Sequence, residues 1–219
     1  MPNIFRRIVT VGWLVLLVAS SSAQNFQVVD YKKVATERAQ KIVATLAIKD
    51  SAKFFRVRSL IAGEYEAIRT IDDQKSESIK ATKSKNMEKS AENAEIEKIT
   101  KKSEESRDAL NLQFTNALKK EINAKQLDLV KDGLTYNVLP KTYKAYLEMI
   151  PSLKKEEKKY IFDALVEARE HAMAAGSSDA KHGWFGKYKG RINNYLSARG
   201  YDLTKEREGW AERIKAAKK

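Results

Sequence analysis

Cysteine is absent from all 219 residues of this sequence. Its absence excludes disulfide bonds, thiolate metal sites and cysteine nucleophiles. It also excludes a bacterial lipoprotein, because the lipid anchor of such a protein needs a cysteine directly after the cleavage point. The chemistry of this chain must therefore rest on other side chains.

The sequence also lacks an apolar run of the roughly 20 residues that a membrane-spanning helix needs. Its longest apolar stretch, residues 8–18, lies between Arg6-Arg7 and the small residues Ser21-Ser22-Ala23. A short apolar core between a positive start and a small-residue cleavage site is typical of a secretory signal peptide. We therefore predict that residues 1–23 are removed on export. The mature chain would begin at Gln24, would have no membrane span and would be periplasmic or secreted.

Proline and glycine are scarce, with three and nine residues respectively. Neither occurs between Gly63 and Gly133, so a long stretch of chain lacks the residues that most weaken helices. No segment alternates apolar and polar residues over enough positions to indicate a strand. The sequence predicts an all-α protein, with residues 24–219 forming a single helical bundle domain.

Residues 72–106 are rich in Lys, Glu, Ser and Ala, and no aromatic residue occurs between Tyr65 and Phe114. This composition favours a solvated helical hairpin that projects from the bundle and reverses near residues 90–93. Disorder and a partner-binding coiled coil are the alternatives for this segment.

Apolar residues at helical spacing place the remaining helices. We expect them at 31–48, from 51 into the hairpin, from the hairpin to Gly133, and at 141–150, 153–175, 180–198 and 201–215. Gly133 and Gly200 are expected to end helices, since glycine is the favoured residue after a helix C-terminus.

The formal net charge is +13. An excess of this size favours an anionic partner through long-range attraction. Nucleic acid is not expected to be that partner, because the chain is predicted to be exported. Acidic polysaccharide, an anionic membrane surface and unfolded acidic proteins remain as candidates.

The strongest basic cluster lies between Asp179 and Asp202, where no acidic residue occurs. If an aromatic residue there reaches the surface beside the cations, it offers a plane for a sugar ring next to groups that bind carboxylates. If the aromatic face instead packs into the core, the cations form an ordinary solvent face. The candidate ligand-binding residues are Lys181, His182, Trp184, Lys187, Tyr188, Lys189, Arg191 and Asn194.

Glycine also recurs in this cluster, at Gly183, Gly186 and Gly190. Because each weakens a helix, their presence suggests close approach by a neighbouring helix or a ligand.

Catalytic and metal-binding interpretations have less support. His182, Tyr188 and Arg191 could together promote β-elimination on a uronate, yet their spacing does not put all three on one helical face. Glu167 and His171 are four residues apart, but two histidines in the whole chain are a poor supply of metal ligands. No glycine loop follows a strand as phosphate-binding loops do. We therefore predict no catalytic residue, metal or cofactor.

Several segments carry a family resemblance: residues 130–138, 142–147, 167–170 and, most specifically, 181–203. Through them the sequence resembles a group of exported Bacteroidetes proteins of unknown function, often encoded among polysaccharide-utilisation genes. The resemblance implies a periplasmic or secreted protein of a Gram-negative cell, acting near glycan breakdown. It brings no catalytic residues with it.

Three shorter segments, 122–126, 153–157 and 203–207, are similar to degenerate copies of the Leu-Thr-x-x-Gln element of small helical periplasmic stress chaperones. Helix N-termini also place Ser, Thr or Asn before Glu or Gln, and this is the interpretation we favour.

The sequence thus predicts a non-enzymatic accessory protein that binds an anionic partner, such as an acidic polysaccharide, through its basic aromatic helix. A periplasmic chaperone-like protein is the alternative, and an enzyme acting on acidic glycans is the third possibility.

Overall fold

The computed structural model describes the backbone of residues 19–217 and the side chains of residues 31–217. Within that range the chain forms eight helices and no strand, which confirms the predicted all-α class. Of the predicted signal peptide only residues 19–23 are described, as the start of the first helix, so its cleavage remains a prediction. No helix of residues 19–217 is both long enough and apolar enough to cross a membrane.

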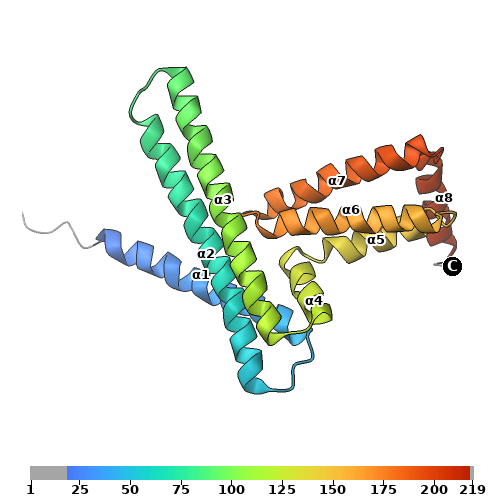
Figure 1. Cartoon of the computed structure of the whole chain (residues 1–219), viewed down its shortest axis with the longest axis horizontal. Helices are drawn as coiled ribbons and strands as arrows, with labels where there is room; N and C mark the ends of the chain where they lie inside the picture. Colours follow the sequence, from blue (N-terminus) through green and yellow to red (C-terminus); the bar gives the residue numbers. More distant parts are fainter. Residues whose placement is uncertain (1–18, 218–219) are drawn as a thin grey trace, which may run out of the picture.

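Two long helices, α2 (Ser51–Lys83) and α3 (Lys89–Glu121), form an antiparallel hairpin, and α1 (Ala19–Ala44) crosses it (Figure 1). The chain reverses at residues 84–88, earlier than the expected 90–93. The reason is Glu88, whose carboxylate accepts hydrogen bonds from the backbone N–H groups of Ser90 and Ala91 and so caps α3. The tip of the hairpin projects beyond the rest of the molecule (Figure 1).

The helix expected to run from the hairpin to Gly133 is in fact two helices. Ile122 adopts an extended conformation, and α4 (Ala124–Leu134) starts afresh after it. Asn123 and Gln126 form a capping box, in which Gln126 N–H donates to Asn123 Oδ1 (2.9 Å) and Asn123 N–H to Gln126 Oε1 (3.2 Å). These two mutual hydrogen bonds stabilise a new helix start that the apolar spacing did not reveal.

A first core lies where α1, α2, α3 and α4 meet. Its largest fully buried side chains are Val43, Val57, Ile61, Leu118 and Val130. We call it the hairpin core.

The second half of the chain forms an arm of four helices: α5 (Val138–Met149), α6 (Lys155–Met173), α7 (Ser178–Ala198) and α8 (Leu203–Ala216). Helices α6 and α7 are antiparallel, α5 lies along α6, and α8 crosses their far end (Figure 1). The arm has its own core, centred on Ile161, Leu165, Phe185, Ile192 and Leu196.

The α6–α7 turn holds the arm against the hairpin. A Cβ atom on Gly176 would lie 1.6 Å from Asp72 Oδ2, so only glycine allows this approach of the turn to α2. Arg169 of α6 adds ion pairs to Asp128 (2.7 Å) and Asp132 (2.8 Å) of α4. The inner corner between hairpin and arm is therefore a fixed part of the fold.

Candidate functional site

Lys181 is buried, with 6% of its surface exposed, and is not the surface cation that the sequence suggested. Its Nζ donates hydrogen bonds to the backbone carbonyls of Ala172 (3.0 Å) and Met173 (3.1 Å) at the C-terminal end of α6. Its charge also interacts with Glu64 of α2, which is 5% exposed. Burial raises the pKa of Glu64 to about 7 and lowers the pKa of Lys181 to about 8. Lys181 therefore joins hairpin and arm instead of facing a ligand.

His182 and Lys189 lie apart from the other candidates on α7. The His182 ring stacks on Tyr136, with 5.4 Å between centroids and 11° between planes. Lys189 lies beside α5, where it lines a shallow depression with Tyr146 and Met149. Asn194 is exposed near the far end of the helix.

The residues considered for β-elimination do not converge. Tyr188 and Arg191 both contact Glu167 of α6, whereas His182 packs against the turn after α4. His182 and Arg191 are also about 13 Å apart along the helix axis, from the 1.5 Å rise per residue. The geometry gives no support to this reaction.

The four remaining candidates form an ordered row along α7, on the side that faces α6, and Tyr195 and Arg199, which were not predicted, continue it. Each of three cations lies over an aromatic ring, an arrangement worth about 0.5–1 kcal/mol per pair at an exposed site. Between residues 184 and 199 the row extends roughly 22 Å along the helix. The pairs are Lys187 over Trp184 (5.1 Å from Nζ to the ring centroid), Arg191 over Tyr188 (5.3 Å from Cζ) and Arg199 over Tyr195 (4.7 Å from Cζ). We call these six residues the cation–aromatic row.

The aromatic rings of the row belong partly to the core and partly to the surface. Tyr188 is buried, whereas Trp184 and Tyr195 are half-buried. Each half-buried ring is held by a ring from α6: His171 stacks on Trp184 (4.4 Å, 14°) and Tyr160 on Tyr195 (3.7 Å, 14°). The sequence left open whether these aromatic rings pack into the core or are exposed beside the cations. Along α7, Tyr188 packs into the core, and Trp184 and Tyr195 are partly exposed beside cations.

Glu167 and His171 each contact residues of α7. Glu167 accepts a hydrogen bond from Arg191 Nη1 (3.0 Å), and a hydrogen bond from the Tyr188 hydroxyl is the main reason that its pKa lies below the ordinary value. His171 is stacked on Trp184. Among the residues with described side chains, no group of three or more His, Asp or Glu is placed to hold a metal ion.

The glycines of α7 do not mark a close approach by a neighbouring helix. A Cβ atom on Gly183, Gly186 or Gly190 would meet no atom within 4 Å. All three are exposed, so the expectation of helix packing at these positions is wrong.

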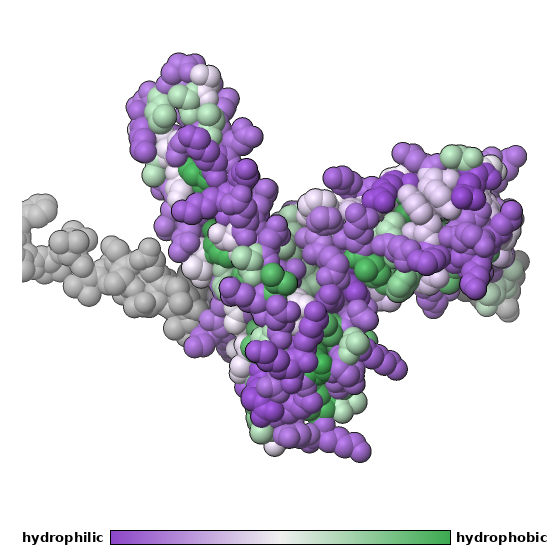
Figure 2. Space-filling model, in the orientation of Figure 1, coloured by the Kyte–Doolittle hydropathy of each residue, from purple (hydrophilic) through white to green (hydrophobic). Residues whose placement is uncertain are grey.

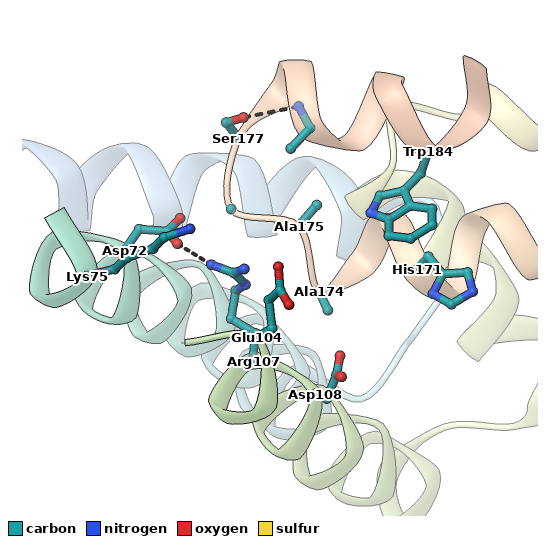
Figure 3. A pocket seen from close by; sticks show the side chains of 12 residues that line it. Asp72, Lys75, Glu104, Arg107, Asp108, His171, Ala174, Ala175, Ser177 and Trp184 are labelled. Atoms are coloured by element: carbon teal, nitrogen blue, oxygen red, sulfur yellow. Dashed lines mark hydrogen bonds and ion pairs between the residues drawn. The ribbon is translucent and has the colours of Figure 1, made fainter. Parts of the chain in front are cut away.

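A cleft of about 560 Å³ opens at the inner corner, beside the start of the cation–aromatic row (Figure 3). The hairpin supplies its charged side and the α6–α7 segment its small and aromatic side. Figure 3 shows the Trp184–His171 stack at one end and the Arg107–Asp72 pair at the other. The lining residues are Asp72, Lys75, Glu104, Arg107, Asp108, His171, Ala174, Ala175, Gly176, Ser177, Ala180 and Trp184. We call this space the junction cleft.

The charges of the junction cleft are mixed. Arg107 is fixed by an ion pair to Asp72 Oδ1 (2.6 Å) and a hydrogen bond to Ser103 Oγ (3.2 Å). The lining thus contains two cations, Arg107 and Lys75, and three carboxylates, all from the hairpin. The cleft is therefore not a binding site for anions alone. Donors and acceptors beside alanine and indole surface suit a ligand with many hydroxyl groups and an apolar ring face. The hairpin half of this site was not predicted from the sequence.

Comparison with protein families identifies the family of this chain. A family model described as "Protein of unknown function (DUF3826)" matches residues 32–216. The chain belongs to this family. The matched range contains every residue of the junction cleft and of the cation–aromatic row. Membership confirms that the chain is part of a family of unknown function, as the sequence resemblance implied. A search of curated proteins found no match.

The three segments of this DUF3826 protein that are similar to chaperone elements are helix starts. Asn123 caps α4, Glu157 Oε2 accepts a hydrogen bond from Lys154 N–H (2.7 Å) at the start of α6, and Asp202 Oδ1 accepts one from Thr204 N–H (3.1 Å) at the start of α8. Helix capping accounts for all three.

The large exposed apolar side chains of the DUF3826 protein come from many parts of the chain. Within residues 31–217 the large ones lie on seven different segments, and Leu129 and Tyr136 line one common cavity. They are Phe55, Met87, Leu112, Leu129, Tyr136, Phe162 and Ile214. The face shown in Figure 2 is mostly hydrophilic, with small separate apolar patches. This distribution does not favour a chaperone that cradles unfolded chains.

Proposed function

We propose that this protein binds an acidic glycan, with one sugar residue in the junction cleft and the following residues along the cation–aromatic row. The observation that carries the proposal is the position of Trp184. Its indole lines the cleft and is also the first ring of the row. Helix α7 runs outward from the inner corner (Figure 1), and a ligand that leaves the cleft at Trp184 would continue along the row.

The junction cleft supplies the chemistry that a sugar residue needs. Trp184 is held in place by His171, and the part of its indole that lines the cleft is an apolar surface for contact with a sugar ring. Glu104 and Asp108 can accept hydrogen bonds from hydroxyl groups, while Lys75 and Arg107 can donate to ring and hydroxyl oxygens.

The row supplies the preference for acidic sugars. The side chains of Arg191 and Arg199 are 52% and 49% exposed, so both guanidinium groups are accessible. Arg191 is paired with Glu167, but an exposed pair of this kind contributes only about 0–1 kcal/mol. The carboxylate of a uronic-acid residue can therefore take the place of Glu167. Its approach is favoured by the positive net charge, which is 13 − 2 = +11 once Arg6 and Arg7 are removed with the signal peptide.

The predicted signal peptide and the resemblance to exported Bacteroidetes proteins encoded among polysaccharide-utilisation genes support the same function. On this view the protein is a non-enzymatic accessory of glycan breakdown, acting in the periplasm or outside the cell. It would hold an acidic polysaccharide and leave its cleavage to other proteins.

Two lysines of α7 provide a matched test. Lys187 lies over Trp184, whereas Lys189 lies beside α5, and both are exposed. We expect Lys187→Ala and Trp184→Ala to weaken binding to polygalacturonate by roughly tenfold, equivalent to about 1.4 kcal/mol. Lys189→Ala removes the same charge and should leave the affinity within about twofold of the unmodified protein. The measurement is affinity electrophoresis at physiological salt, with a neutral galactan for comparison.

Equal losses in the two lysine variants would contradict the proposal. Binding to every polyanion that disappears at physiological salt would do so as well, because it would show only a general field of positive charge.

A further inference from the structure

A second cavity, of about 370 Å³, lies between α1, α2 and the turn after α4. It shares no lining residue with the junction cleft. Arg38 and Lys41 line it, together with the rings of Tyr65 and Tyr136, and no acidic residue does. We call it the turn cavity.

The backbone at the mouth of the turn cavity is unusual. Tyr136 N–H donates to Gly133 O (3.3 Å) and Asn137 N–H to Asp132 O (2.7 Å), which together make a Schellman cap at the end of α4. The left-handed residue of such a cap is usually glycine, because a side chain is strained there. Here Tyr136 has φ 59° and Asn137 has φ 56°.

The same cap occurs at the end of α7 with the usual residue. Gly200 N–H donates to Ser197 O (3.0 Å) and Tyr201 N–H to Leu196 O (3.2 Å), with φ +90° at Gly200. Cap geometry alone is therefore satisfied by glycine in this chain. Tyrosine at the α4 cap keeps a strained backbone, and such strain is characteristic of binding sites.

The cations that line the turn cavity are exposed and complementary to an anion. Tyr136 is 43% exposed, and its ring is oriented by the stack on His182. The Arg38 guanidinium carbon lies 5.8 Å from the centroid of the Tyr65 ring. Burial raises the pKa of Tyr65 to about 12, so its hydroxyl stays a hydrogen-bond donor. Two cationic residues and two tyrosines thus line one space, together with the apolar residue Leu129.

We propose that the turn cavity binds a small organic carboxylate with a ring-sized body. Its carboxylate lies between Arg38 and Lys41, and its ring packs against Tyr136. A sugar acid and an aromatic acid share this chemistry. The site is independent of the proposed glycan path, since the two share no residue.

Isothermal titration calorimetry of the exported chain tests the proposal, with galacturonate and benzoate as probes and galactose and inorganic phosphate as comparators. We expect at least one carboxylate to bind at least tenfold more tightly than either comparator. For galacturonate, which the glycan path can also hold, the binding in the turn cavity is the part that Arg38→Gln removes. Binding of galacturonate would show that the cavity accepts a sugar ring, and binding of benzoate would show that it accepts an aromatic ring.

Three variants locate the site. Arg38→Gln should weaken binding at least tenfold. Tyr136→Gly should do the same while the protein stays folded by circular dichroism, because glycine is the residue that this cap favours. Lys187→Ala, in the glycan path, should leave benzoate binding unchanged. Failure of both carboxylates to bind, equal binding of phosphate, or unchanged affinity in Arg38→Gln and Tyr136→Gly would overturn the proposal.

Discussion

At the scale of single residues, Glu64 and Lys181 show how burial changes the role of a charge. The sequence placed Lys181 among surface cations because it belongs to a basic cluster with no acid between Asp179 and Asp202. The partners of Lys181 come from other helices. Glu64 belongs to α2, and the backbone carbonyls that accept hydrogen bonds from Lys181 lie at the C-terminal end of α6. No local pattern reveals such partners, since they are brought together only when the arm meets the hairpin.

Glu64 predicts how stability should depend on pH. Its pKa rises from an ordinary 4.5 to about 7 in the folded protein, chiefly because of burial. The folded state therefore holds this proton more tightly, so the stabilising contribution is complete below pH 4.5 and is lost as pH rises to 7. Relative to Glu64→Gln, the unmodified protein should lose about 3 kcal/mol across this window, as the shift implies at 1.36 kcal/mol per unit.

The measurement is urea denaturation of both proteins at several pH values between 4 and 8. Parallel stability curves for the two proteins would show that Glu64 is not the group responsible.

At the scale of helices, local signals predicted most elements but not every boundary. Helix α7 was expected at 180–198 and runs from Ser178 to Ala198, because its capping residues and Gly200 act locally. The break before α4 was missed, since apolar spacing continues across it. Gly133 was expected to end α4, but Tyr136 takes the left-handed position.

Gly133 has a packing role instead. A Cβ atom there would lie 2.8 Å from Ile42 Cγ1, so α4 lies directly against α1. We expect Gly133→Ala to destabilise the protein by about 1–3 kcal/mol, as overpacking does in well-packed cores. Gly190→Ala is the control, because a Cβ atom there meets nothing within 4 Å. It should be neutral, or stabilising by up to about 1 kcal/mol, through helix propensity.

Thermal and urea unfolding of the two alanine variants would measure the difference. Similar stabilities would mean that Ile42 moves aside at little cost.

At the scale of the whole molecule, the site is formed by two parts of the chain, α7 and the hairpin, and only α7 was predicted from the sequence. The aromatic and basic side of α7 was singled out as a candidate, and the cation–aromatic row lies there. The hairpin side, from Asp72 to Asp108, has the composition of a solvated helix, which hides its contribution to the junction cleft. The approach of Gly176 to Asp72, with the Lys181–Glu64 interaction, brings the two sides together.

The central claim is that hairpin and α7 act as one glycan site, and Glu104→Ala tests it most directly. Glu104 lies on the hairpin wall of the cleft (Figure 3). If only net charge attracts an acidic glycan, removing this carboxylate should strengthen binding. If Glu104 accepts hydrogen bonds from a sugar residue in the cleft, its removal should weaken binding of a galacturonate oligosaccharide by roughly tenfold. Calorimetry at physiological salt decides between them: a weaker complex is the result we predict, and an equal or tighter one would contradict the account.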